Sequence, residues 1–199
     1  MEIKENRSDP QTTPPTRHGR WVKLDPLSPK YHEFLYQFAI ELPDVFSWKF
    51  QSSHPSFDAF HQRLAEGMLS IFVVVESRTN APIGLVTTHQ ANLQNGTAYL
   101  GGGVVSSFRG SGIAIEAFTV YLRYLFKTYN LRKVYVPVPE FMEPRIFSSV
   151  GRLLQKEGEL EDYVFAAGRW WSQLVFAIYR TEFQKLDTSG GLRPRGRHG

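Results

Sequence analysis

Short apolar runs, some alternating with polar residues and some unbroken, recur along the chain and predict β-strands. Seven strands are expected, over residues 20–24, 70–76, 83–88, 97–105, 133–138, 161–165 and 171–180. The second and third strands are joined through Asn80 and Pro82, which predicts a hairpin, and Asn95-Gly96 marks the next tight turn. The pattern therefore favours a sheet in which consecutive strands are mostly antiparallel.

Apolar residues at helical spacing predict four helices between these strands. They cover residues 28–43, 56–66, 114–130 and 143–156. The order is then strand, two helices, three strands, helix, strand, helix and two strands, without an internal repeat or a linker that would split it. We expect one α/β (α+β) domain over residues 19–186, preceded by a disordered polar leader at 1–18 and followed by a disordered basic tail at 187–199.

Composition excludes several kinds of site and of segment. The 199 residues contain no cysteine, so disulfides, thiolate metal sites and cysteine nucleophiles are excluded. No stretch approaches the roughly 20 apolar residues of a membrane span, and a cytoplasmic location is expected. The net charge of +4 is modest, and three arginines lie in the last ten residues. That segment is either a solvated end or a weak contact for phosphate.

Two glycine-rich segments stand out. Gly101, Gly102 and Gly103 interrupt a predicted strand, which indicates a β-bulge or a closely approaching ligand. The turn Arg109-Gly110-Ser111-Gly112 then opens the clearest helix of the chain. The unpaired N–H groups and dipole of a helix start bind anions, and glycines let a phosphate approach closely. Taken alone, the turn fits an anion site and an ordinary helix start equally well.

The sequence around this turn resembles the acyl-CoA signature of the GNAT N-acetyltransferases, Gln/Arg-x-x-Gly-x-Gly/Ala. The resemblance implies a mostly antiparallel GNAT-like sheet of about seven strands, splayed at its centre and flanked by about four helices. It also implies acetyl-CoA as co-substrate, with the pantetheine arm along the strand that carries a bulge. The implied cofactor contacts are Val104, Val105, Arg109, Gly110, Ser111, Gly112, Ile113 and Ala114.

A closer resemblance is to the RimJ/RimL-like branch of that family, over roughly Trp21 to Phe183. It rests on Glu116-Ala117 after the signature, on Glu157-Gly158 and on Gly168-Arg169 near the end. The catalytic half departs from the branch. Its usual Asn-x-x-Ser is missing from residues 140–145, and Gly151 is followed by Arg152 instead of Phe.

An amine that attacks a thioester must lose a proton, and the resulting oxyanion needs a donor, here expected to be a backbone N–H near Val104. Glu140 is a candidate that would either bind or deprotonate the amine. Glu116, in the first helical turn, is either a base or a structural acid. Further candidate bases are Tyr99, His89, Ser148 and Ser149. No metal is predicted, since the histidines show no ligand spacing.

The sequence therefore predicts acetyl transfer from acetyl-CoA to a primary amine on a protein N-terminus or a small molecule. Two alternatives stay open: an acyltransferase of the same fold fed by aminoacyl-tRNA, and a non-catalytic module that binds CoA. Expected partners are a small-molecule or peptide amine, with tRNA less favoured and no membrane. The chain is expected to be a monomer or a homodimer.

Overall fold

The computed structural model describes residues 17–41, 49, 55–108, 110–143 and 151–189. Its seven strands form one sheet in the order β1-β2-β3-β4-β5-β7-β6. Every neighbouring pair is antiparallel except β4 with β5, which are parallel. The strands are β1 (Val22–Pro26), β2 (Met68–Glu76), β3 (Pro82–Asn92), β4 (Thr97–Val104), β5 (Lys133–Pro139), β6 (Gln155–Ala166) and β7 (Arg169–Tyr179). The predicted strand count and the mostly antiparallel arrangement are confirmed.

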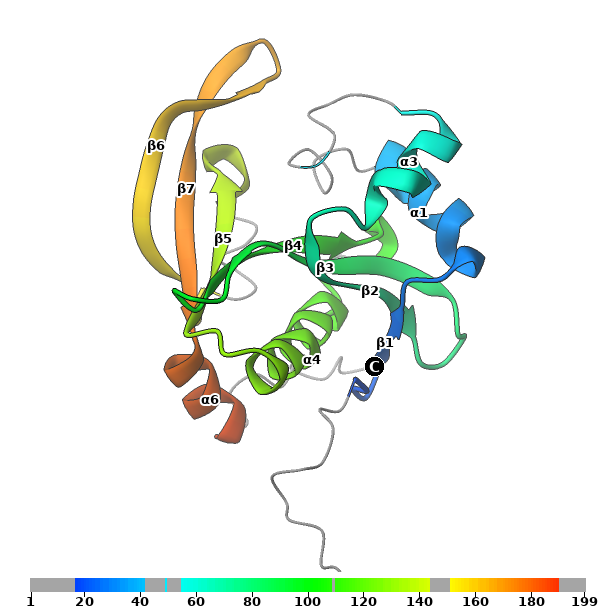
Figure 1. Cartoon of the computed structure of the whole chain (residues 1–199), viewed down its shortest axis with the longest axis horizontal. Coiled ribbons are helices and arrows are strands. Elements are labelled where there is room, and N and C mark those ends of the chain that lie inside the picture. The colour runs from blue at the N-terminus through cyan, green and yellow to red at the C-terminus, as the bar shows by residue number, and fades with distance from the viewer. Residues whose placement is uncertain (1–16, 42–48, 50–54, 109, 144–150, 190–199) are drawn as a thin grey trace, which may run out of the picture.

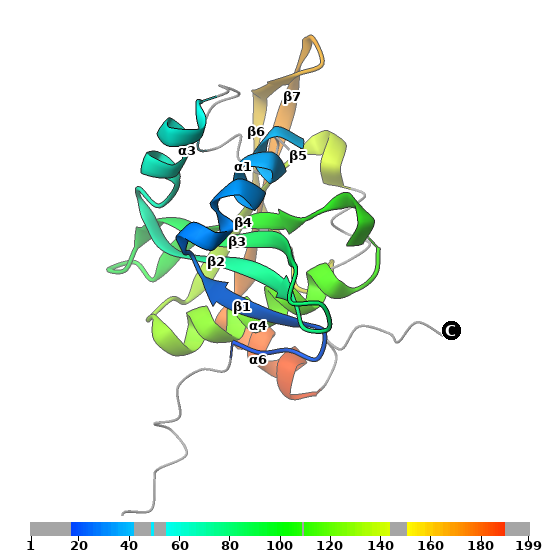
Figure 2. The ribbon, with the colours of Figure 1, turned by 90° about the vertical axis from the view of Figure 1, so that its right-hand side faces the viewer.

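Helices cover both faces of the sheet (Figure 2). The α-helices are α1 (His32–Glu41), α3 (Phe57–Leu64), α4 (Ile113–Thr128) and α6 (Arg180–Thr188). Three single turns of 3-10 helix are η2 (Pro29–Tyr31), η3 (Ser106–Phe108) and η4 (Glu140–Met142). Helices α1 and α3 lie over β2 and β3 on one face, and α4 lies on the other. Among the helices of the described ranges, none combines the length and apolar character that crossing a bilayer requires.

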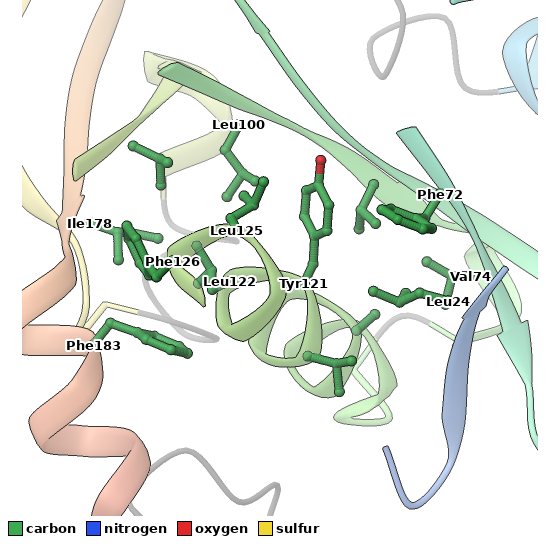
Figure 3. Close-up of a cluster of buried hydrophobic side chains, with 14 of the residues drawn as sticks. Leu24, Phe72, Val74, Leu100, Tyr121, Leu122, Leu125, Phe126, Ile178 and Phe183 are labelled. Carbon is green, nitrogen blue, oxygen red and sulfur yellow. The ribbon is translucent and has the colours of Figure 1, made fainter. Parts of the chain in front are cut away.

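The largest core lies between α4 and the sheet (Figure 3). Leu122 and Leu125 are buried there against strand residues that include Leu100 and Ile178. Tyr121 points from the helix to the sheet, and its hydroxyl lies 2.6 Å from Ser70 Oγ and 2.7 Å from Thr88 Oγ1. Because these bonds join the middle of α4 to β2 and β3, the helix is held at a fixed position relative to the sheet.

The chain end differs from the prediction in two places. The helix expected over 143–156 is wrong in its second half, because residues 151–153 form a turn and β6 begins at Gln155; residues 144–150 lie outside the described ranges. The backbone of this segment pairs with β7, and this long-range pairing overrides local helical spacing. Helix α6 was not predicted. It buries Phe183 against Phe126 and reaches Thr188, so the expected domain end at 186 falls within its last turn.

Candidate active site

The two central strands separate along their length (Figure 1). They pair only at Thr97↔Lys133, Ala98↔Val134 and Tyr99↔Tyr135. Beyond these pairs β4 continues with β3 as far as Val104, whereas β5 continues with β7 as far as Pro139. The fork that results is closed at Tyr99 and Tyr135 and opens toward the start of α4.

The predicted bulge at the triple glycine is wrong in form. The register between β3 and β4 is unbroken from Gly84↔Val104 to His89↔Tyr99. Instead, Gly102 has a φ of +134°, and a Cβ there would lie 2.2 Å from the carbonyl oxygen of Leu85. The glycine is thus required by close backbone contact with β3, which keeps β4 on the β3 side of the fork.

The turn before α4 has the backbone that its glycines predict. Gly110 and Gly112 have φ of +73° and +83°, in the left-handed region, and a Cβ on Gly110 would meet nothing within 4 Å. Ser111 donates its hydroxyl to the Phe108 carbonyl at 2.6 Å, which holds the turn closed. Gly112 is the N-cap of α4 and brings no side chain, and the N–H of Ile113 donates to Ser111 Oγ at 3.3 Å. The N–H groups of Ala114 and Ile115, which follow it, have no acceptor within the helix. Arg109 lies outside the described residues.

These residues fit a phosphate-containing ligand at the open end of the fork. Ala114 follows Ile113 in the first turn of α4, where the helix dipole adds positive potential. Val104 and Val105 end β4 at the same side, and Val105 N–H donates to Ile83 O at 2.8 Å. A phosphate group can therefore approach Gly110 and Gly112 while an extended chain lies along β4.

The two carboxylates predicted as catalytic candidates lie in different surroundings. Glu140 is exposed in η4, directly after β5, beside Phe141, whose ring packs 5.1 Å from that of Trp171. Glu116 accepts the backbone N–H groups of Arg20 and Trp21, one on each oxygen, both at 2.8 Å. Hydrogen bonds therefore engage both oxygens of Glu116. Ser148 and Ser149 lie outside the described residues.

Tyr99 and His89 are brought together by the sheet. They are cross-strand partners, with ring centroids 6.0 Å apart, and Tyr99 in turn lies 5.2 Å from Tyr135. Burial and then the charge of Lys49 lower the pKa of His89 to about 4, so the imidazole is neutral at pH 7. Tyr135 was not among the predicted site residues. The matching third positions of Tyr99 and Tyr135 in their strands were the only sequence signal for this pair.

The two faces of the central strands differ in how deeply their side chains are buried. Ala98, Leu100 and Val134 are buried on the side of α4. Tyr99 and Tyr135, on the opposite face, are only partly buried although they stand in the middle of the sheet. The closed end of the fork is therefore partly exposed at Tyr99 and Tyr135, on the face opposite α4. Among the described residues, no group of three or more His, Cys, Asp or Glu side chains could hold a metal.

The match to a family profile identifies the family of this chain. The profile described as "Acetyltransferase (GNAT) domain" matches residues 22–140, which hold β1 to β5 and the turn before α4. The chain belongs to the GNAT acetyltransferase family. The resemblance inferred from the signature turn is thus confirmed at the level of the family, and the splayed sheet is the GNAT fold.

Curated relatives of this GNAT protein include two uncharacterised N-acetyltransferases. One is the SPbeta prophage-derived YokL of Bacillus subtilis, 31% identical over 57% of this chain and 63% of its own length. The other is p20 of Bacillus licheniformis, 29% identical over 59% of this chain and 66% of its own length. The chain thus spans just under two thirds of each relative.

Solved structures share the fold at lower identity. Spermidine N-acetyltransferase from Vibrio cholerae, in complex with CoA and spermine, aligns with a TM-score of 0.72 at 21% identity, over 83% of this chain and 99% of that one. A GNAT-family acetyltransferase from Bacillus anthracis aligns with a TM-score of 0.65 at 18% identity, over 81% and 96%.

Proposed function

We propose that this GNAT protein is an N-acetyltransferase that moves the acetyl group of acetyl-CoA to a primary amine by direct attack on the thioester. The observation that carries the proposal is the fork between β4 and β5, with the glycine-capped start of α4 at its open end. A fork of this shape supplies a slot for an extended thioester arm and an anion site for the phosphates at one end of that slot.

These positions indicate how the donor, acetyl-CoA, would lie in the fork. With the pyrophosphate at residues 110–114, an arm that runs along β4 carries its acetyl end toward the closed end of the fork at Tyr99 and Tyr135. Since Val105 N–H points to β3, strand alternation directs the N–H of Val104 toward the β5 side. This N–H is the proposed donor to the carbonyl oxygen, whose negative charge grows as the amine adds.

No enzyme-bound acyl group is needed. The amine nitrogen forms a bond to the carbonyl carbon, the C–S bond breaks, the sulfur leaves as the CoA thiolate, and the proton lost by the nitrogen passes to water or to a nearby base. Holding both substrates in one site supplies much of the acceleration, about 7–11 kcal/mol in well-oriented cases. A missing Asn-x-x-Ser is compatible with this scheme, because positioning contributes without any particular acid or base.

The acceptor is proposed to be a primary ammonium that enters from the face opposite α4. Glu140 supplies a carboxylate at the end of β5, and the neighbouring Phe141 supplies an aromatic ring 5.1 Å from that of Trp171. The face of Trp171 already carries the guanidinium of Arg169, 3.4 Å from the ring centroid. Carboxylates and aromatic faces both attract cations. The Vibrio cholerae neighbour was solved with spermine, which supports a small-molecule amine, whereas the RimJ/RimL-like resemblance supports a peptide N-terminus.

A thiol-release assay with acetyl-CoA tests the activity. Polyamines, aminoglycoside-type amines and peptides with free N-termini are offered as acceptors, and release of CoA thiol above the hydrolysis rate is expected with at least one class. Acetyl-CoA binding without transfer to any acceptor would favour the non-catalytic module. Acyl transfer from aminoacyl-tRNA without measurable affinity for CoA would favour the tRNA-dependent alternative.

A further inference from the structure

Residues 17–21, called the N-terminal arm below, are bound tightly to the first turn of α4. Gly19 N–H donates to Val22 O at 2.7 Å, and Leu24 N–H donates to Arg17 O at 2.8 Å, so the arm folds back onto β1. At its turn, the N–H groups of Arg20 and Trp21 both donate to the carboxylate of Glu116. One side chain of α4 thus fixes the backbone of the arm.

Gly19 packs so closely against Glu116 that a larger residue would not fit. A Cβ on Gly19 would lie 2.8 Å from Cδ of Glu116, so a larger residue there would displace the carboxylate. Trp21 O also accepts Ser77 N–H at 2.8 Å, which anchors the arm to the end of β2. The position of the arm is therefore set from two sides.

The arm carries an exposed arginine, Arg20, whose backbone is bound one helical turn from the N-cap of α4. Glu116 contacts both residues: its side chain accepts the N–H of Arg20, and its own N–H donates to Gly112 O at 3.1 Å. Glu116 and Gly112 are one helical turn apart, about 6 Å along the axis. The Arg20 guanidinium is exposed and lies over the Trp21 ring, 5.2 Å from its centroid. If it left the Trp21 ring, the Arg20 side chain would be long enough to reach from Glu116 to Gly112.

We propose that Arg20 binds the 3′-phosphate of coenzyme A and that Glu116 is the positioning residue that holds Arg20 in place. This inference rests on the proposed function, since it needs the pyrophosphate at residues 110–114. CoA carries a second phosphate on its ribose, outside the pyrophosphate, and an arginine pairs well with a phosphate monoester. Glu116 keeps its negative charge, which opposes the dianion, but both of its oxygens are engaged by the arm, and the placement of Arg20 is proposed to outweigh this repulsion.

Calorimetric titration with CoA and with 3′-dephospho-CoA tests the proposal, because the two ligands differ only in the phosphate that Arg20 is assigned. Arg20→Ala should weaken the affinity for CoA by about tenfold and leave the affinity for dephospho-CoA unchanged, so that the parent's preference for CoA is lost. Lys127→Ala removes one positive charge from the last turn of the same helix and should leave both affinities as in the parent.

Glu116→Gln separates positioning from charge. Removal of a negative charge near a phosphate would tighten CoA if Glu116 acted by charge alone. We expect the opposite sign: Glu116→Gln should weaken the binding of CoA but not that of dephospho-CoA. The double variant Arg20→Ala with Glu116→Gln should bind CoA no more weakly than Arg20→Ala alone.

Tighter CoA binding by Glu116→Gln, or equal losses for the two ligands in Arg20→Ala, would overturn the proposal. An absence of binding of either ligand to the parent would instead overturn the proposed function.

Discussion

At the scale of single residues, Glu140 and Glu116 are both acids at the ends of secondary-structure elements, and their surroundings separate them. Glu116 has each oxygen engaged by a backbone N–H, whereas Glu140 is exposed beside an aromatic pair. An exposed carboxylate attracts an ammonium ion through its charge, and a neighbouring aromatic ring adds to that attraction. We therefore expect Glu140 to bind the acceptor amine.

Glu140→Gln should raise KM for the amine several-fold while kcat and the affinity for acetyl-CoA change little, because a charge contact made before the transition state acts on binding. Steady-state kinetics with the acceptor found by the thiol-release assay measures this. Glu143→Gln, three residues along the chain at the end of η4, is the matched control. A fall in kcat of about 10²-fold or more with KM unchanged would make Glu140 the general base instead.

His89 predicts a pH dependence of stability. Its folded-state pKa of about 4 lies below the usual 6.5, so the unfolded chain takes up this proton first as the pH falls. The stability that neutral His89 contributes is present above pH 6.5 and is lost as the pH falls from there to about 4, by up to about 3 kcal/mol. Urea unfolding between pH 7 and pH 4 should show a shallower loss in His89→Gln. Equal slopes in the two proteins would contradict the buried neutral imidazole.

At the scale of elements, α6 ties the end of the chain to α4. Phe183 is buried against Phe126, and Arg123 donates three hydrogen bonds from Nε and Nη2 to the carboxylate of Asp187, at 2.6 to 2.9 Å. Phe183→Ala should destabilise the protein by about 3–5 kcal/mol, since it removes a fully buried ring.

Removal of residues 190–199, the basic end of the chain, should leave the melting temperature unchanged. A cooperative melt lost on that truncation would show that these residues pack.

Strands and the signature turn could be predicted from sequence because their causes are local. Unbroken apolar runs joined by a turn predict β2 and β3, and the left-handed backbone at Gly110 and Gly112 follows from glycine itself. The missed elements depend on distant partners. Helix α6 has only Phe183 and Leu186 on its apolar side, and its stability comes from α4. The region 151–156 becomes turn and strand because β7 lies beside it.

Candidate site residues divide in the same way. The turn at 110–114 could be found from its motif, whereas the surroundings of Glu116 could not, because Arg20 lies 96 positions earlier in the chain. Tyr135 became visible only when the sheet order placed β5 beside β4. The acceptor side was the least predictable, since it combines η4 with β7, and no local pattern links Phe141 to Trp171.

At the scale of the whole molecule, the account depends on a sheet that is paired at one end of its centre and open at the other. The α4 core fixes the start of that helix under the central strands, and the opposite face leaves Tyr99 and Tyr135 accessible. A donor held on one side and an acceptor entering from the other would meet near the closed end of the fork. The central claim is that the CoA phosphates lie on the turn that begins α4.

Calorimetric titration of CoA into the parent and into two variants of Gly112 tests that claim most directly. Gly112→Asp and Gly112→Asn have nearly the same shape, and Asp and Asn both tolerate the left-handed backbone at φ +83°, so they differ chiefly by one negative charge at the helix start. The account predicts that CoA binds the parent and that the Asp variant loses at least about tenfold more affinity than the Asn variant. Equal affinity of the two variants for CoA would contradict it.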